Sequence, residues 1–304
     1  MVFKPAPSRG GWIGIALVLV AVAVEAVLWG AAWSAGPGPR AALLGVLAAV
    51  LLPVGAFLVY WTWGFFSLRY TLTRDGLSIA WAASRQIVPM EAITHILAGR
   101  PYAAPLRGFH WPGHAVGRTI IRDDNDHPQP TLVYASAEPA SQIVIVTPAL
   151  AYAISPADPV AFIDDFKMRR RLGPVQPLQQ HTEQARWARS TLWRDPTGLA
   201  LLAAGFLLNV LAWAWLTWRF PGLPAEVNVQ FRYDPVLRAP VPEMLQPLST
   251  VWRLPQIGLA GLVANGVLAA LVHGRARMAA LLLLLGAVLV QVGLMVVLSH
   301  LGAG

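Results

Sequence analysis

Residues 12–33 read WIGIALVLVAVAVEAVLWGAAW, an apolar run of 22 residues whose only charged side chain is Glu25. A helix needs about 20 consecutive apolar residues to cross the hydrocarbon core of a bilayer. Four further runs come close to that length or exceed it: Ala41 to Phe66, Thr197 to Trp218, Leu254 to Val272 and Met278 to Ser299. The sequence therefore predicts an α-helical multi-pass membrane protein with about five transmembrane helices.

The composition supports the same class. Of the 304 residues, 56% are hydrophobic and only 12% are charged, and the mean hydropathy is +0.54. The formal charge of +8 suits a membrane protein whose basic residues collect on the cytoplasmic side, so we predict no nucleic-acid partner. Cysteine is absent, which excludes disulfides, thiolate metal sites and cysteine nucleophiles.

The basic residues next to the helices predict the orientation. Lys4 and Arg9 precede the first helix, whereas only Arg40 lies between the first and second. Because basic residues favour the cytoplasmic side, we expect a cytoplasmic N-terminus. Ala32-Trp33-Ser34 resembles a signal-peptide cleavage site, but the apolar run before it is too long, so we expect a retained anchor.

Residues 69–172 differ from the rest because short β-rich runs alternate with turn residues. We expect Asp75-Gly76 to supply the positive φ of a tight hairpin turn. Ser155 to Asp158 is a helix start signal, and the helix that follows ends in a basic run. The predicted strands are Arg69 to Thr73, Leu77 to Trp81, Gln86 to Pro89, Ile93 to Leu97, Arg118 to Arg122, Thr131 to Ser136, Gln142 to Thr147 and Leu150 to Ile154.

Three segments of this region together resemble the bacterial pleckstrin-homology-like (bacterial PH) domain. They are Tyr70 to Ile79 (YTLTRDGLSI), Ile87 to Ile93 (IVPMEAI) and Ala151 to Phe162 (AYAISPADPVAF). The resemblance covers about a third of the chain. The predicted strands and the helix after them make a small barrel or sandwich with one end plugged, and the resemblance implies an inserted, mainly antiparallel β PH-like barrel closed by a C-terminal helix, a non-enzymatic fold used for binding or assembly. With the orientation predicted from the basic residues, we expect a bacterial inner-membrane protein with this domain in the cytoplasm.

The last three helices carry a second resemblance. Leu223 to Phe231 (LPAEVNVQF), directly after a predicted helix, is similar to a motif in a membrane module of unknown function that also occurs in toxin-immunity proteins. That module has His where this chain has Gln230. We predict four parts: two transmembrane helices in 1–68, the PH-like barrel in 69–172, a linker and juxtamembrane segment in 173–196, and three transmembrane helices in 197–304 with an external loop at 219–253.

Four polar residues fall inside the predicted helices: Glu25, Asn209, Asn265 and Gln291. A carboxylate in the middle of a membrane is costly and is normally paired, protonated or exposed to water. One interpretation is a neutral Glu25 that hydrogen-bonds one of the three amides and holds helices together. The other is a proton- or ligand-linked role for Glu25.

A long loop, Gly99 to Gly117, forms the candidate binding loop through Arg107, Phe109, His110, Trp111 and His114. Its aromatic residues either enter the membrane surface, contact a partner, or cap the barrel's own core. The histidine spacing is not diagnostic of zinc, so we predict no metal site. A separate basic set, Arg169, Arg170, Arg171, Arg186 and Arg189, is expected to face anionic lipid head groups.

No nucleophile elbow, phosphate loop, dinucleotide fingerprint or zinc-protease motif is present in the sequence. We therefore predict a non-enzymatic membrane-anchored binding, scaffold or regulatory protein, with no cofactor and with membrane lipids and a further protein as partners. The alternative is a small transporter or immunity-type membrane protein that acts through Glu25 and the C-terminal helices.

Overall fold

The computed structural model of the chain describes residues 1–122, 126–176, 178–185, 188–234, 236 and 239–301. Its contacts divide the chain into two compact units. Unit 1 comprises Met1–Val22 and Val54–Ala188, and unit 2 comprises Ala23–Pro53 and Arg189–Gly304.

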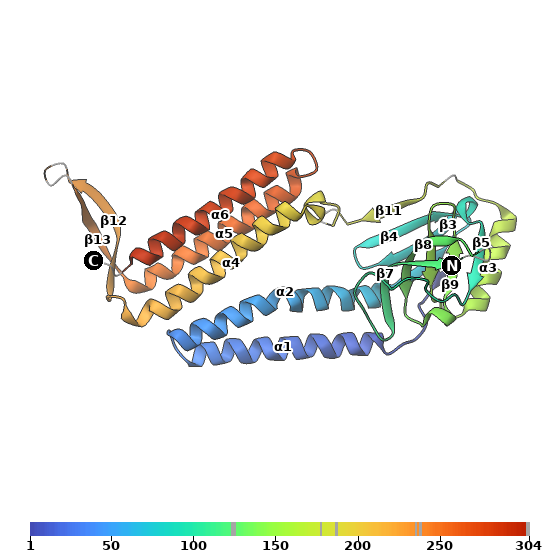
Figure 1. The fold of residues 1–304 in the computed structure, drawn as a ribbon, viewed down its shortest axis with the longest axis horizontal. Coiled ribbons are helices and arrows are strands. Elements are labelled where there is room, and N and C mark those ends of the chain that lie inside the picture. The colour runs from blue at the N-terminus through green and yellow to red at the C-terminus, as the bar shows by residue number, and fades with distance from the viewer. Residues whose placement is uncertain (123–125, 177, 186–187, 235, 237–238, 302–304) are drawn as a thin grey trace. The chain divides into compact units, whose positions relative to one another are not determined.

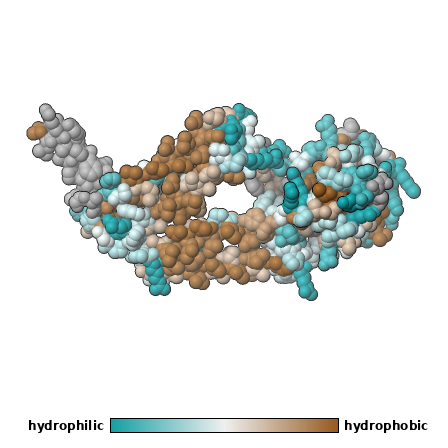
Figure 2. All heavy atoms as spheres, viewed as in Figure 1, coloured by the Kyte–Doolittle hydropathy of each residue, from teal (hydrophilic) through white to brown (hydrophobic). Residues whose placement is uncertain are grey.

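The five long helices agree with the predicted runs. They are α1 (Gly10–Ser34), α2 (Pro39–Ser67), α4 (Pro196–Arg219), α5 (Arg253–Val272) and α6 (Arg277–His300). All five are long and apolar enough to cross a membrane. Only 11% to 28% of the residues in the most apolar stretch of each helix are buried inside the protein. Figure 2 shows the apolar side chains that cover their surfaces. The prediction of five such helices is confirmed, and insertion into a membrane stays a prediction.

Unit 1 contains two β-sheets and a helix that packs on them, together with the first part of α1 and the second part of α2 (Figure 1). One sheet has the order β1-β2-β3-β4-β11 and the other has the order β5-β9-β10-β8-β7-β6. The strands are β1 (Val2–Phe3), β2 (Arg69–Leu72), β3 (Gly76–Trp81), β4 (Ser84–Pro89), β5 (His95–Ala98), β6 (His110–Trp111), β7 (His114–Arg122), β8 (Pro128–Ala135), β9 (Ile143–Val146), β10 (Ala151–Ile154) and β11 (His181–Gln184), and the helix is α3 (Pro159–Leu172).

All eight predicted strands are present, and of the two predicted arrangements, a barrel or a sandwich, no closed barrel is found among the described residues. In the described residues the strands form two separate sheets rather than one continuous cylinder. Neighbouring strands are antiparallel except β8 and β10, which run parallel. The hydrophobic core is shared by β2, β3, β9, β10 and the inner face of α3, where Phe162 is fully buried. Tyr70 joins the sheets by donating to the carbonyl of Tyr134 at 2.7 Å.

The helix start predicted at Ser155 to Asp158 is confirmed by α3. Asp158 caps its first turn by accepting from the backbone N–H of Ala161, and Pro159 occupies the first turn. The basic run predicted for the end of the helix lies in its last turn. There the cations face the negative end of the helix dipole.

The hairpin between β2 and β3 is present, but the reason given for its glycine is wrong. Gly76 does not have a positive φ. A Cβ at this position would instead lie 2.3 Å from the backbone oxygen of Val88 on β4. Glycine is therefore required by the close approach of two strands, and the turn is held by Thr73, whose backbone N–H donates to Gly76 at 2.9 Å.

The N-terminal residues are part of the β-domain, which sequence reasoning did not predict. β1 pairs with β2, and the terminal ammonium of Met1 donates to the carbonyl of Leu72 at 2.7 Å. Further along, the N–H of Ala6 donates to the carbonyl of Ser155 at 2.7 Å. The first eight residues thus attach the start of α1 to the folded domain.

Unit 2 is built on α4, α5 and α6, which lie side by side (Figure 1). The segment predicted as an external loop contains an antiparallel hairpin of β12 (Glu226–Asp234) and β13 (Ala239–Pro247). The predicted linker is likewise structured: β11 extends the first sheet of unit 1, and the short helix η3 (Thr191–Arg194) leads into α4.

Candidate functional site

The candidate binding loop packs against the ends of α1 and α2. Trp111 is buried, and its indole N–H donates to the carbonyl of Gly10 at 2.8 Å. Phe109 stays 41% exposed, although its ring centroid lies 4.9 Å from that of Phe57 on α2. Arg107 and His110 are exposed. The aromatic residues therefore join the domain to the helices, an arrangement that none of the three sequence interpretations described.

His114 lies at the centre of this contact, among the rings of four aromatic residues. We call these five residues the junction cluster: Trp61, Phe65, Trp81, Trp111 and His114. The imidazole centroid is between 5.3 and 6.4 Å from each of the four rings. Only 1% of His114 is exposed, and neither ring nitrogen has a hydrogen-bond partner among the described residues. Burial therefore lowers the pKa of His114 to about 4, because a low-dielectric site disfavours the imidazolium.

Glycines on both helices let the domain approach this closely. A Cβ on Gly64 of α2 would lie 2.5 Å from Cε2 of Trp81. A Cβ on Gly10 of α1 would lie 2.3 Å from the backbone oxygen of Gly113, the oxygen that accepts from the hydroxyl of Ser8 at 2.7 Å. Backbone and indole thus meet the helices directly, which fixes the β-domain to the helix ends within unit 1.

The amides of the long helices do not hydrogen-bond Glu25 in the described contacts, in contrast to one interpretation of the sequence. Asn209 donates to the side-chain oxygen of Gln291 at 3.1 Å and to the carbonyl of Pro255 at 2.9 Å, while Gln291 donates to the carbonyl of Gly258 at 2.7 Å. These bonds join α4, α5 and α6. Asn265 donates only to Gly261 of its own helix in the described contacts. The buried carboxylate oxygens of Glu25 have no partner among the described residues.

This difference between two amides gives a direct test. We expect Asn209→Leu to destabilise the bundle by about 1 kcal/mol, the scale of interhelical hydrogen bonds in membranes, because Pro255 and Gln291 lose their donor. Asn265→Leu is the control, since its bond stays within one turn of α5. Reversible unfolding in mixed micelles measures both changes. Equal losses for the two variants would contradict the assigned role of Asn209.

The predicted lipid-facing arginines are not equivalent. Arg169 pairs with Asp165 at 2.8 Å and its side chain is only 22% exposed. Arg170 donates to the carbonyl of Thr94 at 3.4 Å. Arg171 and Arg189 are exposed, and Arg186 lies outside the described residues. Two of the five guanidinium groups are thus engaged with the β-domain, and contact with lipid stays a prediction for the others.

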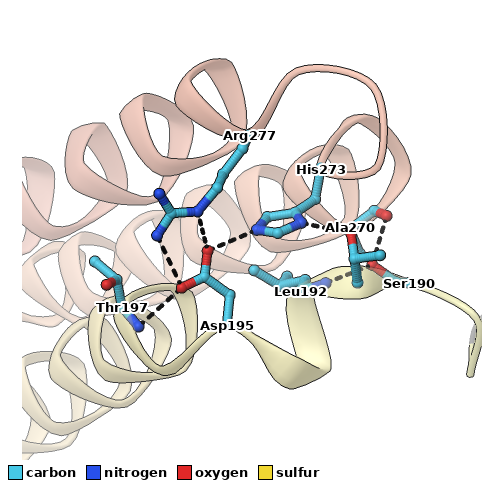
Figure 3. Close-up of polar contacts among 8 residues, drawn as sticks. Ser190, Leu192, Asp195, Thr197, Ala270, His273 and Arg277 are labelled. Atoms are coloured by element: carbon cyan, nitrogen blue, oxygen red, sulfur yellow. Dashed lines mark hydrogen bonds and ion pairs between the residues drawn. The ribbon is translucent and has the colours of Figure 1, made fainter.

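A polar cluster that sequence reasoning missed lies at the start of α4 (Figure 3). The side chain of Asp195 is 6% exposed and accepts from Arg277 at 2.7 and 3.2 Å and from Nε2 of His273 at 2.9 Å. Its carboxylate also caps α4 by accepting from Thr197 at 3.1 Å. The hydrogen bonds from Arg277 and His273 hold the pKa of Asp195 well below its ordinary value. Only the cap could be read from Asp195-Pro196, because the other partners are about 80 residues away.

The cluster continues to the linker through the other nitrogen of His273. Since Nε2 donates to Asp195, Nδ1 of a neutral ring accepts from the hydroxyl of Thr191, 2.6 Å away. A carboxylate, imidazole and hydroxyl in this order can activate a hydroxyl. Here Arg277 occupies both carboxylate oxygens, and Ser190 beside Thr191 donates to the carbonyl of Ala270 at 2.8 Å. We therefore assign the cluster to holding η3 and α4 on the turn between α5 and α6.

Within the described residues, no group of three or more His, Asp or Glu side chains could hold a metal ion. Comparison with known families gives one match: the model for the bacterial PH domain matches residues 68–170, about a third of the chain. Neither a curated protein nor a solved structure matches the sequence. The family match spans β2 to β10 and most of α3, and leaves out β1 and β11 of the first sheet.

Proposed function

We propose that this chain is a membrane-anchored binding protein whose bacterial PH domain recruits or regulates another protein at the cytoplasmic face of the inner membrane. The observation that carries the proposal is the bacterial PH domain at residues 68–170, which suggests a non-enzymatic binding or scaffold role. The junction cluster supports it, since the domain is packed on the ends of the helices instead of being carried by a flexible connection. A partner bound to the domain would be held close to the bilayer.

A transport function receives less support from the polar residues. Asn209 and Gln291 are bonded to each other and to backbone carbonyls, so the bundle does not offer Glu25 a chain of free polar groups in the described contacts. A proton or ion pathway through a membrane normally requires several such groups in sequence. We therefore retain the binding function as the single proposal.

Site-specific crosslinking in the intact protein tests the proposal. Deleting the domain would leave Met1–Ser8 and the end of α2 without their contacts, so the full chain is required. A photoreactive amino acid is placed at Met168, an exposed position on α3, and in a control at Leu289, an exposed position on α6. We expect irradiation of native membranes to give a protein adduct of discrete mass from Met168 and lipid adducts from Leu289.

The experiment is repeated at Val160, another exposed residue of α3, in case the photoreactive group at Met168 points away from the partner. If neither Met168 nor Val160 gives a protein adduct while Leu289 still labels lipid, the domain is not a protein-binding module and the proposal fails.

A further inference from the structure

Unit 2 contains an apolar cavity of about 620 Å³. It is lined by the parts of α1 and α2 nearest their connecting turn, by α4, and by the end of the short helix η5 (Leu248–Trp252). Four indoles line it, those of Trp29, Trp33, Trp213 and Trp252. Its volume falls within the range of natural small-molecule sites, which is roughly 300 to 1,000 Å³.

The walls offer contact area and few polar groups. The lining from α2 consists of small residues that include Gly45 and Ala49, so their side chains leave the space unfilled. Thr217 is the one hydroxyl in the wall, and it donates to the carbonyl of Trp213 in its own helix at 2.7 Å. An occupant therefore needs an apolar body and no fixed hydrogen-bonding pattern.

The medium around the helices determines which apolar molecule can enter the cavity. Water does not stably fill a large apolar cavity, and an empty one leaves its walls without dispersion contacts. The helices that form the cavity are long, apolar and largely uncovered, so in the proposed membrane location the neighbouring medium is lipid hydrocarbon. Indoles favour the interface between hydrocarbon and head groups. Four of them gather near the helix ends, where a lipid would place its glycerol and head group.

We propose that the cavity holds one acyl chain of a membrane phospholipid, which enters beside these indoles and packs against Gly45 and Ala49. The inference rests on the membrane location in the proposed function but not on a protein partner. A bound chain would fill the space between the helix pair α1–α2 and α4, and would make the lipid an integral part of unit 2.

A filling variant and a matched control test the proposal. No atom lies within 4 Å of a Cβ on Gly45, so the side chain of Gly45→Leu can enter the cavity without displacing its walls. Gly286 on α6 is equally open but does not line the cavity, which makes Gly286→Leu the control. Ala49→Leu fills the same space from a second position. Each chain is placed in nanodiscs of phosphatidylethanolamine and phosphatidylglycerol that contain a trace of phospholipid with a diazirine in its acyl chain.

After irradiation, labelled peptides are mapped by mass spectrometry. In the natural chain and in Gly286→Leu we expect labelling of residues 41–49 and 210–217 to exceed labelling of the outer surfaces of α5 and α6 several-fold. Gly45→Leu and Ala49→Leu should reduce that excess to the level of those surfaces. Even labelling of all helices, or an excess that persists in both filled variants, would overturn the acyl-chain site. Absence of label from every helix would instead overturn the membrane location.

Discussion

Acidification below about pH 6.5 is expected to weaken the attachment of the β-domain to α1 and α2, by about 3 kcal/mol once the pH has fallen to about 4. The sign follows from His114. Its imidazole has an ordinary pKa of 6.5 when the chain is unfolded, and burial lowers the pKa to about 4 in the folded protein. As the pH falls between these values, the unfolded chain binds the proton first, so the stability of unit 1 declines and then levels off.

The measurement is the difference between two chains, because carboxyl groups also titrate in acid. His114→Phe removes the titratable group and two unpartnered nitrogens while keeping an aromatic ring in the junction cluster. We expect it to be more stable than the natural chain at neutral pH, by about 1 to 3 kcal/mol, and to lack the decline between pH 6.5 and 4. Amide hydrogen exchange of residues 110–118 reports the junction directly. His110→Gln, at an exposed position of the same loop, is the control.

A methyl group on α2 is expected to have opposite effects at two glycines. Gly55→Ala should stabilise the helix by up to about 1 kcal/mol, because alanine is the better helix former and no atom lies within 4 Å of the new Cβ. Gly64→Ala should instead destabilise unit 1 by about 1 to 3 kcal/mol, the usual cost of overpacking, since its Cβ would overlap the indole of Trp81. That indole is buried against Trp61, 4.8 Å away between centroids, and has little room to move.

Thermal unfolding of the two variants, followed with hydrogen exchange at β3, gives the comparison. A stabilising effect at both positions would mean that Trp81 is not held against α2. In that event the description of the junction cluster as a close, glycine-dependent contact would be incorrect.

The parts of the fold that the sequence predicted are those coded by neighbouring residues. Apolar runs of sufficient length identified the five long helices, and alternating β-rich runs identified eight strands. Ser155 to Asp158 located the start of α3, because an N-cap and a first-turn proline act within one turn.

The elements that the sequence did not predict depend on contacts between residues far apart in the chain. Strand β1 has two residues and forms only because β2, nearly 70 residues later, offers it a partner. Strand β11 reads as a polar linker, and its pairing with β4 gives no periodic apolar signal. The sequence predicted a barrel or a sandwich without deciding between them, because strand-length patterns do not determine which edges pair.

The candidate site was predicted in part for the same reason. Phe109, Trp111 and His114 could be selected as an unusual aromatic loop, but the sequence did not indicate that α2 would supply the opposite wall. Asp195 could be read as a helix cap, whereas its bonds to His273 and Arg277 required the α5–α6 turn to fold back onto it. One interpretation of the sequence paired Glu25 with one of the helix amides, yet Asn209 and Gln291 bond each other.

The linker between the β-domain and α4 has only a short length that is free to extend. In the sequence this segment has more than 20 residues, but β11 pairs with β4, the N–H of Ala185 donates to the carbonyl of Ala83, and Ser190 donates to the carbonyl of Ala270 in the last turn of α5. Five peptide steps between Ala185 and Ser190 can reach roughly 17 Å at full extension. A pull beyond that length must break one fastening, and four paired residues of an edge strand can peel off one at a time. Under a pulling force, strand β11 would therefore detach from β4 before the helices α4, α5 and α6 begin to unfold.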